Sequence, residues 1–238
     1  MHKTRTEAAA GTGVRGMFTA IAPRYDLLNH LLSLNLDRSW RRRAVDQLLA
    51  ERPAPGLFLD ACAGTLDLAC ELARRPGFDG RVIACDFSMP MLERGVPKTD
   101  GLAVAPVCAD ALTLPLADAS VGGATVGFGV RNLSSIDDGL RELARVLRPS
   151  APLVILEFTT PRVQPLRGIY LMYFRRVLPR IGRIVSRHAT AYSYLPASVL
   201  EFPAPAELAE RIERAGFIDV RWERYSAGIV AAHIARRA

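Results

Sequence analysis

One stretch, from Phe58 to Ala69, constrains the fold more than any other part of the chain. A short apolar run ends at Asp60, passes through small residues around Gly64, and continues as a helical pattern. This pattern is typical of a strand whose carboxyl end turns sharply into a helix. Small residues let a ligand approach the backbone, and the first turn of the helix offers unpaired N–H groups. The stretch therefore predicts a ligand-binding turn.

Four further apolar runs are expected to be strands, at 81–86, 103–108, 120–127 and 152–158. Helical patterns separate them, and Asp86 and Asp110 stand where the first two of these runs end. Two last strands are expected at 220–224 and 228–234, after a helix at 205–215. Such alternation predicts an α/β domain with a parallel sheet covered by helices. Because ligands bind at the carboxyl ends of such strands, Asp60, Asp86 and Asp110 indicate one site.

The chain has 238 residues, half of them apolar and 23% charged, which suits one packed domain. Residues 1–16 are polar and small, and we expect them to be flexible. A single domain is expected over 17–238, with a helical cover at 17–50 and an inserted lid at 161–203. We find no signal-peptide pattern and no apolar stretch long enough to span a bilayer, and expect a cytoplasmic protein.

The net charge of +7 comes from arginine, since Lys3 and Lys98 are the only lysines. Such a balance suits an anionic partner or a solvated surface, and the basic run at 38–43 is read as a solvated helix face. A nucleic-acid enzyme or binder is the alternative from another class. We expect no nucleic-acid partner, because lysine is scarce, no aromatic residues interleave the basic runs, and no Asn/Asp-Pro-Pro-Tyr motif follows the strand at 120–127.

The four cysteines never form a C-x-x-C pair, and no His or Cys cluster has the spacing of metal ligands. They lie in or beside apolar runs, where cysteine usually acts as a small buried hydrophobe. We therefore expect no metal site and a reducing compartment.

The turn after the first strand indicates the class of cofactor. Residues 61–66 contain one glycine, Gly64, where a dinucleotide-binding turn has three. A pyrophosphate would have poor access to this backbone. Asp86 lies about 20 residues further on, where an acid binds the ribose hydroxyls of a nucleoside ligand. A ligand with adenosine but no phosphate fits better, and S-adenosylmethionine is the expected one.

Several motifs together resemble one family, the C-methyltransferases that convert demethylmenaquinol to menaquinol and methylate the equivalent benzoquinol in ubiquinone synthesis. The resemblance covers Met17 to Ile234, and the matching segments are Met17–Phe18, Ile21–Asn29, Gly64–Thr65 with Asp67, Asp86–Ser88, Met91–Leu92, Gly127–Asn132, Leu156–Phe158, Tyr192, Tyr194–Leu195 and Phe202–Pro203. It implies a Rossmann-like S-adenosylmethionine-dependent methyltransferase fold. That fold is a mostly parallel seven-stranded sheet with an antiparallel last strand, helices on both faces, and a helical lid insertion.

The resemblance also implies which residues bind the cofactor. We expect Thr65 to contact its amino-acid end, Asp86 its ribose and Asp110 its adenine amino group. Asp60 is expected to hold the turn and attract the methionyl ammonium. The full expected cofactor-binding set is Asp60, Gly64, Thr65, Asp86, Phe87, Asp110, Ala111 and Gly127.

Leu66 departs from the family, which usually has a glycine at this position. A leucine beside the methionyl group would weaken cofactor binding, whereas one that points into the core would not. We expect the Leu66 side chain to point into the core. A non-catalytic methyltransferase-like binding protein remains the alternative.

Methyl transfer to a ring carbon needs a positioned quinol and a stabilised phenolate. Arg131 and Asn132, just after the strand at 120–127, are the expected catalytic residues, with Tyr25 as a third. Because an arginine side chain stays protonated, Arg131 is assigned phenolate stabilisation or water positioning. The expected substrate-binding residues are Asp26, Phe128, Tyr170, Phe174, His188 and Tyr192. His30 and His233 are expected to be structural.

The lid contains an amphipathic, strongly aromatic segment at 166–178 with arginines around it. Such a segment suits a polyprenyl tail and anionic headgroups, or simply packs its aromatic rings on the core. We expect a prenylated quinol substrate, demethylmenaquinol before the benzoquinol, and contact with the inner membrane face. Another phenol or a polyketide as substrate, and a homodimer, stay open.

Overall fold

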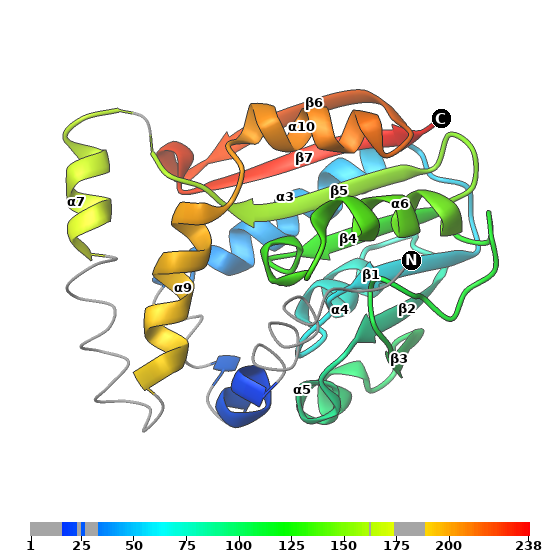
Figure 1. Ribbon diagram of the computed structural model, residues 1–238. Helices are drawn as coiled ribbons and strands as arrows, with labels where there is room; N and C mark the ends of the chain where they lie inside the picture. Colours follow the sequence, from blue (N-terminus) through cyan, green and yellow to red (C-terminus); the bar gives the residue numbers. More distant parts are fainter. Residues whose placement is uncertain (1–15, 23–24, 27–32, 162, 174–188) are drawn as a thin grey trace.

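A computed structural model describes residues 16–22, 25–26, 33–161, 163–173 and 189–238. Seven strands form one sheet in the order β3-β2-β1-β4-β5-β7-β6 (Figure 1). Their bounds are β1 Leu57–Ala61, β2 Arg81–Asp86, β3 Val104–Cys108, β4 Gly123–Gly127, β5 Pro152–Phe158, β6 Phe217–Tyr225 and β7 Val230–Arg237. Strands β1 to β5 pair in parallel, whereas β7 runs antiparallel to both β5 and β6. The expected mostly parallel sheet with an antiparallel last strand is confirmed.

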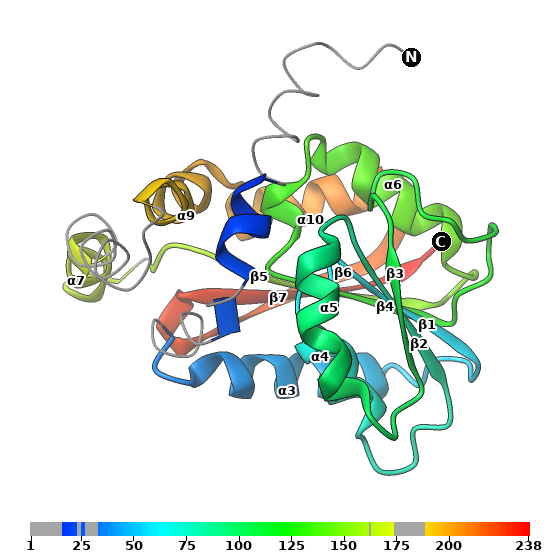
Figure 2. The ribbon, with the colours of Figure 1, turned by 90° about the horizontal axis from the view of Figure 1, so that it is seen from below.

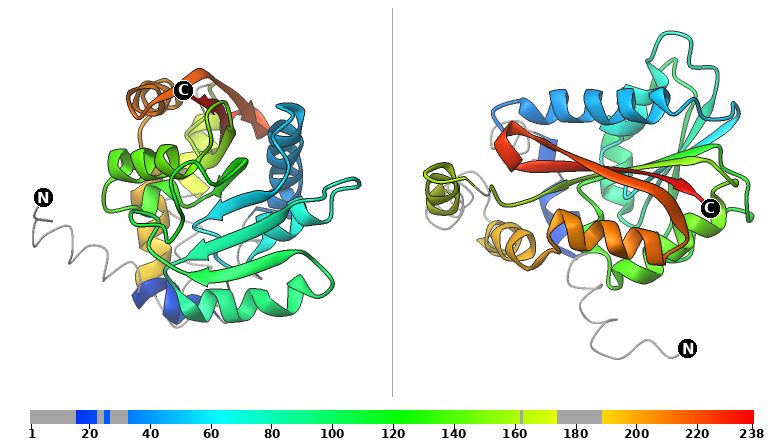
Figure 3. Two further views of the ribbon diagram at one scale, coloured as in Figure 1. Left: turned by 90° about the vertical axis from the view of Figure 1, so that its right-hand side faces the viewer. Right: turned by 90° about the horizontal axis from the view of Figure 1, so that it is seen from above.

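Helices cover both faces of the sheet. Figures 2 and 3 show α3 and α10 on opposite sides of it. Among the described residues, the α-helices are α3 Leu36–Ala50, α4 Asp67–Ala73, α5 Met89–Gly95, α6 Ile136–Val146, α7 Leu166–Met172, α9 Ala189–Glu201 and α10 Pro205–Arg214. The short 3-10 helices are η2 Val96–Thr99, η3 Val130–Asn132 and η5 Ser226–Gly228.

The core lies in two layers, one on each face of the sheet. Along β5, Leu153 and Ile155 pack in the layer with α6 and α10, while Val154 and Leu156 pack in the layer with α3 and α4. Successive side chains of a strand point to opposite faces, so a strand covered on both sides is apolar throughout. This is why β5 appears in the sequence as an unbroken apolar run.

The sheet's topology fixes where a ligand can bind. The chain moves outward from β1 to β3 and then returns to β4 on the other side of β1. Neighbouring connections therefore leave β1 and β4 toward opposite faces, and a crevice opens at their carboxyl ends. The turn after β1 lies at this point.

Two expectations at the periphery needed adjustment. Both final strands are longer than expected: β6 begins at Phe217 rather than Val220, and β7 ends at Arg237 rather than Ile234, because the antiparallel ladder also pairs Phe217 with Arg237 and Ile218 with Arg236. Cys70 and Cys85 are buried as expected, but Cys108 is exposed because it ends the edge strand β3.

Residues 16–22 and helices α7 and α9 lie near the carboxyl ends of the strands (Figure 1). A helical turn at 16–21 brings Phe18 against Phe87, with ring centroids 6.3 Å apart. In the lid, Tyr170 of α7 and Val199 of α9 form a small buried cluster with Phe158 and Ile229. The expected substrate residues Phe174 and His188 lie outside the described residues, as does His30.

Candidate functional site

The turn between β1 and α4 is built from left-handed backbone conformations. Cys62, Gly64 and Leu66 have φ values of 56°, 53° and 68°. The Ala63 carbonyl accepts a hydrogen bond from the Leu66 N–H at 2.9 Å, and the Gly64 N–H donates to Asp86. A left-handed φ is unstrained for glycine but costs roughly 1 kcal/mol for residues such as Cys62 and Leu66. The contacts around the turn must therefore stabilise this conformation.

Asp60 ties the turn to its neighbours. It is fully buried, and its carboxylate accepts from the Ala69 N–H at 3.0 Å and from the Thr125 hydroxyl at 2.9 Å. Burial raises the pKa of Asp60 to about 7, because desolvation outweighs these two hydrogen bonds. These bonds join β1 to α4 and β4 on either side of the turn, and the contact of Asp60 with the methionyl ammonium stays a prediction.

Asp86 ends β2 directly beside the turn. Its two carboxylate oxygens accept from the N–H groups of Gly64 and Ser88, each at 2.8 Å. Burial raises the pKa of Asp86 above its usual range. A carboxylate oxygen accepts more than one hydrogen bond, so these contacts orient Asp86 and leave lone pairs for two ribose hydroxyls. Asp86 therefore offers hydrogen-bond acceptors that fit the nucleoside half of the expected cofactor.

Asp110 and Ala111 follow β3, next to β2 in the sheet. Asp110 is exposed, and one carboxylate oxygen accepts from the Leu112 N–H at 3.0 Å, as in a loop-capping acid. Phe87 is half-buried between the end of β2 and Phe18. The predicted adenosine-binding residues thus lie along neighbouring strand ends, and their contacts with the cofactor stay a prediction.

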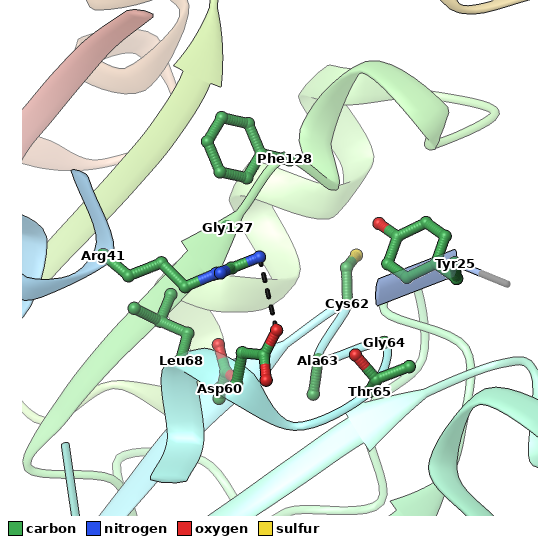
Figure 4. A pocket seen from close by; sticks show the side chains of 11 residues that line it. Tyr25, Arg41, Asp60, Cys62, Ala63, Gly64, Thr65, Leu68, Gly127 and Phe128 are labelled. Atoms are coloured by element: carbon green, nitrogen blue, oxygen red, sulfur yellow. Dashed lines mark ion pairs between the residues drawn. The ribbon is translucent and has the colours of Figure 1, made fainter. Parts of the chain in front are cut away.

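A pocket opens at the carboxyl ends of β1 and β4 (Figure 4). Its lining combines the turn with side chains from the N-terminal cover and the end of β4: Tyr25, Arg41, Asp60, Cys62, Ala63, Gly64, Thr65, Asp67, Leu68, Gly127 and Phe128. Five residues predicted to bind the cofactor or act in catalysis meet here, namely Tyr25, Asp60, Gly64, Thr65 and Gly127. Asp86 is hydrogen-bonded to Gly64 of the pocket lining. The pocket and the acids at the ends of β2 and β3 therefore form one continuous region at the carboxyl ends of the strands.

Leu66 does not line this pocket. Its side chain is fully buried in the layer with α3 and α4. A Cβ at Gly95 would lie 2.4 Å from the Leu66 Cγ, so Gly95 of α5 leaves the space that the leucine fills. The expectation that Leu66 points into the core is confirmed.

Arg41 is a pocket residue that the sequence interpretation missed. The basic run at 38–43 was read as a solvated face, and Arg38, Arg42 and Arg43 are indeed exposed. Arg41, however, is 11% exposed, and its guanidinium pairs with Asp37 at 2.5 Å and with Asp67 at 3.4 Å. The available signal was helical spacing, because Arg41 lies one turn after Asp37, on the side of α3 that carries buried Trp40, Ala44 and Val45.

Thr65 connects the turn to the N-terminal cover. Its hydroxyl donates to Asp26 at 2.5 Å, and the other Asp26 oxygen pairs with Lys98 at 2.6 Å. Lys98 also pairs with Asp67 at 2.7 Å. The predicted substrate residue Asp26 therefore contacts a predicted cofactor residue, and one lysine joins the cover to α4.

Arg131 and Glu157 form a buried ion pair just beyond the pocket. Their side chains are 6% and 2% exposed, with the Arg131 Nη1 2.6 Å from the Glu157 Oε1. Arg131 Nη1 also donates to the Phe128 carbonyl, and the guanidinium lies over the Phe158 ring, 5.4 Å from its centroid. Glu157 was recognised only as part of a motif, and no local pattern indicated its pairing with a residue 26 positions earlier.

Asn132 faces the lid. Its side-chain oxygen accepts from the Tyr194 hydroxyl at 3.0 Å, and its amide nitrogen donates to the Phe128 carbonyl at 3.3 Å. Tyr170 is buried in the cluster between α7 and α9, where desolvation raises its pKa. For Tyr192 the structure describes the backbone in α9 but not the side chain. Arg131 and Asn132 therefore lie near the lid residues Tyr170 and Tyr194 at the ends of β4 and β5, whereas Tyr25 lines the pocket.

Comparisons with known proteins agree with this geometry. A model of the ubiE/COQ5 methyltransferase family matches residues 3–237. The chain is 46% identical over 224 residues to a demethylmenaquinone methyltransferase of Thermus thermophilus, which covers 93% of this chain and 100% of that protein. It is 40% identical over 232 residues to a ubiquinone/menaquinone biosynthesis C-methyltransferase of Citrifermentans bemidjiense, with 94% and 96% covered.

Among solved structures, a SAM-dependent methyltransferase of Thermotoga maritima is similar with a TM-score of 0.66. The two chains are 17% identical, and the match covers 94% of this chain and 100% of that one. At this level of identity the likeness supports the fold alone, including the strand order that places the pocket.

Proposed function

The chain belongs to the ubiE/COQ5 methyltransferase family, and on that premise we propose that its methyl acceptor is a ring carbon of a prenylated quinol, demethylmenaquinol first. It is an S-adenosylmethionine-dependent C-methyltransferase. When bound, the cofactor supplies an electrophilic methyl group on a sulfonium. The chain's own residues must then hold a quinol ring beside the pocket and stabilise the charge that develops on its oxygen.

The observation that carries the proposal is the buried Arg131–Glu157 pair beside Phe128. Phe128 lines the pocket and its carbonyl accepts from Arg131, so the guanidinium lies just beyond the lining, next to Phe128. The Arg131 Nε is buried and has no hydrogen-bond partner within the described part of the chain. A buried donor of this kind is normally satisfied, and a phenolate or water oxygen would satisfy it.

Arg131 is held by a carboxylate, a carbonyl and an aromatic face, so little reorganisation is needed when charge develops. An arginine guanidinium has N–H donors and no acceptor, so Arg131 is suited to stabilise a phenolate rather than to accept its proton. Asn132, oriented by Tyr194, offers a further polar group at the same edge.

Aromatic side chains form a wall suited to a flat ring. Phe128 lies 4.5 Å from Phe158 and 6.2 Å from Trp40, measured between ring centroids. Stacked and edge-on contacts of this kind favour aromatic ligands. Because Phe128 also borders the pocket, this wall lies between the cofactor region and the lid.

The lid also supports a prenylated substrate. Val163, Met172 and Leu200 are large apolar residues that are 68%, 51% and 41% exposed, in the segments that lead into and form α7 and α9. Apolar side chains at the outer edge of a site suit a polyprenyl tail and the membrane interface that holds it. These side chains support a cytoplasmic protein that contacts the inner membrane face. None of the helices in the described ranges is long and apolar enough to cross a bilayer.

The test is an assay with a labelled methyl donor and three acceptors: demethylmenaquinol, the prenylated benzoquinol precursor of ubiquinone, and a tail-less naphthol. We expect the label on demethylmenaquinol, with slower turnover of the tail-less compound because it lacks contacts with the lid. Turnover of the tail-less compound alone would contradict a prenylated substrate. No turnover of any acceptor by protein that binds the cofactor would contradict a quinol acceptor.

The benzoquinol is the second candidate. A relative at 40% identity is named for both ubiquinone and menaquinone biosynthesis, which supports the benzoquinol as an alternative acceptor. The same assay distinguishes them, since the two prenylated acceptors are compared at equal concentration.

A further inference from the structure

The pocket lining includes the cationic side chain of Arg41, which is not among the cofactor-binding residues expected from the sequence. Asp60 and Asp67 are the acids in its lining, and among the described lining residues Arg41 is the only basic one. Arg41 comes from α3, outside the strand–turn–helix unit, and its side chain crosses the pocket near Asp60 (Figure 4).

The Arg41 guanidinium is held in place from one side. Asp37, itself 3% exposed, accepts from the Ser33 hydroxyl at 2.6 Å and pairs with the Arg41 Nη1 at 2.5 Å. A residue one helical turn away thus fixes the direction of the side chain before any ligand binds. Such preorganisation reduces the entropy lost on binding.

The other side of the guanidinium is only loosely engaged. The Arg41 Nη2 lies 3.4 Å from Asp67, which is long for a hydrogen bond, while Asp67 has a closer partner in Lys98 at 2.7 Å. An anion entering the pocket can therefore take the Nη2 side of Arg41 without leaving Asp67 unpaired.

The order of the strands indicates which part of the cofactor reaches this point. The acids expected to bind adenosine lie after β2 and β3, whereas the pocket lies at β1 and β4, on the other side of the turn. A ligand that extends from the first group to the second brings its amino-acid end into the pocket. That end carries an ammonium and a carboxylate, and a carboxylate removed from water needs a cation or several donors.

We propose that Arg41 binds the carboxylate of the cofactor's methionyl group, opposite Asp60, which takes the ammonium. Arg41 then discriminates between S-adenosyl amino acids and adenosine thioethers that lack the amino-acid end. This role rests on the S-adenosylmethionine-dependent activity but not on the identity of the methyl acceptor.

The experiment measures affinity by calorimetry for S-adenosylhomocysteine and for 5′-methylthioadenosine, which keeps the adenosine and the thioether but lacks the amino acid. Arg41→Met should weaken binding of S-adenosylhomocysteine by about 10- to 100-fold, the loss expected for charge-assisted hydrogen bonds. Its affinity for 5′-methylthioadenosine should stay within about twofold. Arg41→Lys keeps the charge without the planar fork and should lie between the two.

Arg42→Met is the matched control. Arg42 follows Arg41 on the same helix, its side chain is 66% exposed, and its nearest acid, Glu71, is 3.9 Å away. This variant should bind both ligands as the unaltered protein does. Equal losses for both ligands in Arg41→Met would overturn the proposal and assign Arg41 a structural role, and no loss for either would overturn it as well.

A second measurement needs no substitution. The unaltered protein should bind the decarboxylated analogue of S-adenosylhomocysteine about 10- to 100-fold more weakly than the parent compound. Equal affinity would contradict a carboxylate contact even if Arg41→Met failed to fold. Failure of the unaltered protein to bind any of the ligands would contradict the cofactor assignment instead.

Discussion

Asp60 is fully buried at the pocket, and burial raises its pKa to about 7, with Arg41 opposing this shift and Asp86 adding to it. The ionised form attracts an ammonium, whereas the protonated form does not. At pH values below about 7, free Asp60 is therefore increasingly protonated, and a ligand that needs its charge binds up to about tenfold more weakly per pH unit.

We expect the affinity for S-adenosylhomocysteine to fall between pH 8 and pH 6, and Asp60→Asn to bind weakly with no such pH dependence. Calorimetric titrations at several pH values would test this. The effect on folding has the opposite sign: the folded state holds the Asp60 proton more tightly, so Asp60 lowers stability as pH rises from 3.8 to about 7. Constant affinity across the range would contradict an ionised Asp60 as the ammonium partner.

Leu66 combines a left-handed backbone with a fully buried side chain. Leu66→Gly relieves roughly 1 kcal/mol of backbone strain but leaves a cavity, and large-to-small core substitutions cost about 2–5 kcal/mol. We expect a net loss of about 1–4 kcal/mol in the free energy of unfolding, measured with denaturant.

Cofactor affinity should stay within about twofold in Leu66→Gly, because the side chain faces the core rather than the pocket. Leu72→Ala, in the same helix–sheet layer, is a control for simple loss of core volume. Much tighter binding by Leu66→Gly would show that the leucine obstructs the ligand.

At the scale of elements, the site depends on the junction between η3 and the end of β5. Glu157 of β5 accepts from the Arg131 guanidinium at 2.6 Å and from the Phe158 N–H at 2.9 Å. Its carboxylate therefore positions Arg131, the expected catalytic residue in the loop after β4. Glu157→Gln keeps the shape but leaves the buried Arg131 charge unpaired.

We expect Glu157→Gln to lower kcat on the order of 10²-fold, as misplaced catalytic groups do, with little change in cofactor affinity. Steady-state kinetics together with calorimetry would separate the two effects. Glu142→Gln is the control, because Glu142 pairs with Arg145 on α6 and lines no part of the pocket. An unchanged kcat in Glu157→Gln would exclude Glu157 as a positioning residue.

At the scale of the whole molecule, Lys98 connects parts that are distant in sequence. It pairs with Asp26 of the N-terminal cover and with Asp67 at the start of α4, while Thr65 donates to the same Asp26. Both ion pairs are partly exposed, so each contributes at most about 1 kcal/mol to stability. We expect their larger effect to be on how firmly the N-terminal segment stays over the bound cofactor.

We expect Lys98→Met to release S-adenosylhomocysteine several-fold faster and to increase amide hydrogen exchange in residues 16–26, with a nearly unchanged melting temperature. Lys98→Arg should retain most of the unaltered behaviour. Stopped-flow dissociation and hydrogen exchange would provide these values. Unchanged hydrogen exchange in these residues would contradict a role for Lys98 in keeping the N-terminal segment over the cofactor.

The sequence predicted the parts of the site that follow from local pattern. Asp60 and Asp86 end apolar runs, and Gly64 interrupts the turn, so their positions at neighbouring strand ends followed from the α/β alternation alone. Strand lengths at the β6–β7 edge were underestimated, because the pairing of Phe217 and Ile218 with Arg237 and Arg236 depends on the partner strand rather than on local alternation. Glu157 was missed as a site residue because its partner Arg131 lies on another element. Arg41 was missed because the basic run at 38–43 was read as a solvated face, although Asp37 lies one turn before it on the same helix.

By itself, then, the sequence determined the order of strands and helices, the strand-end acids and a turn suited to an adenosine ligand without phosphate. Only the tertiary structure decided that Leu66 enters the core, that Arg41 turns into the pocket, and that Glu157 holds Arg131. The physical reason is that apolar periodicity acts along the chain, whereas the burial of a charge and the choice of its partner depend on which distant elements pack together. The pKa of Asp60 near 7 belongs to the second kind, because packing from β4 and α4 removes its water.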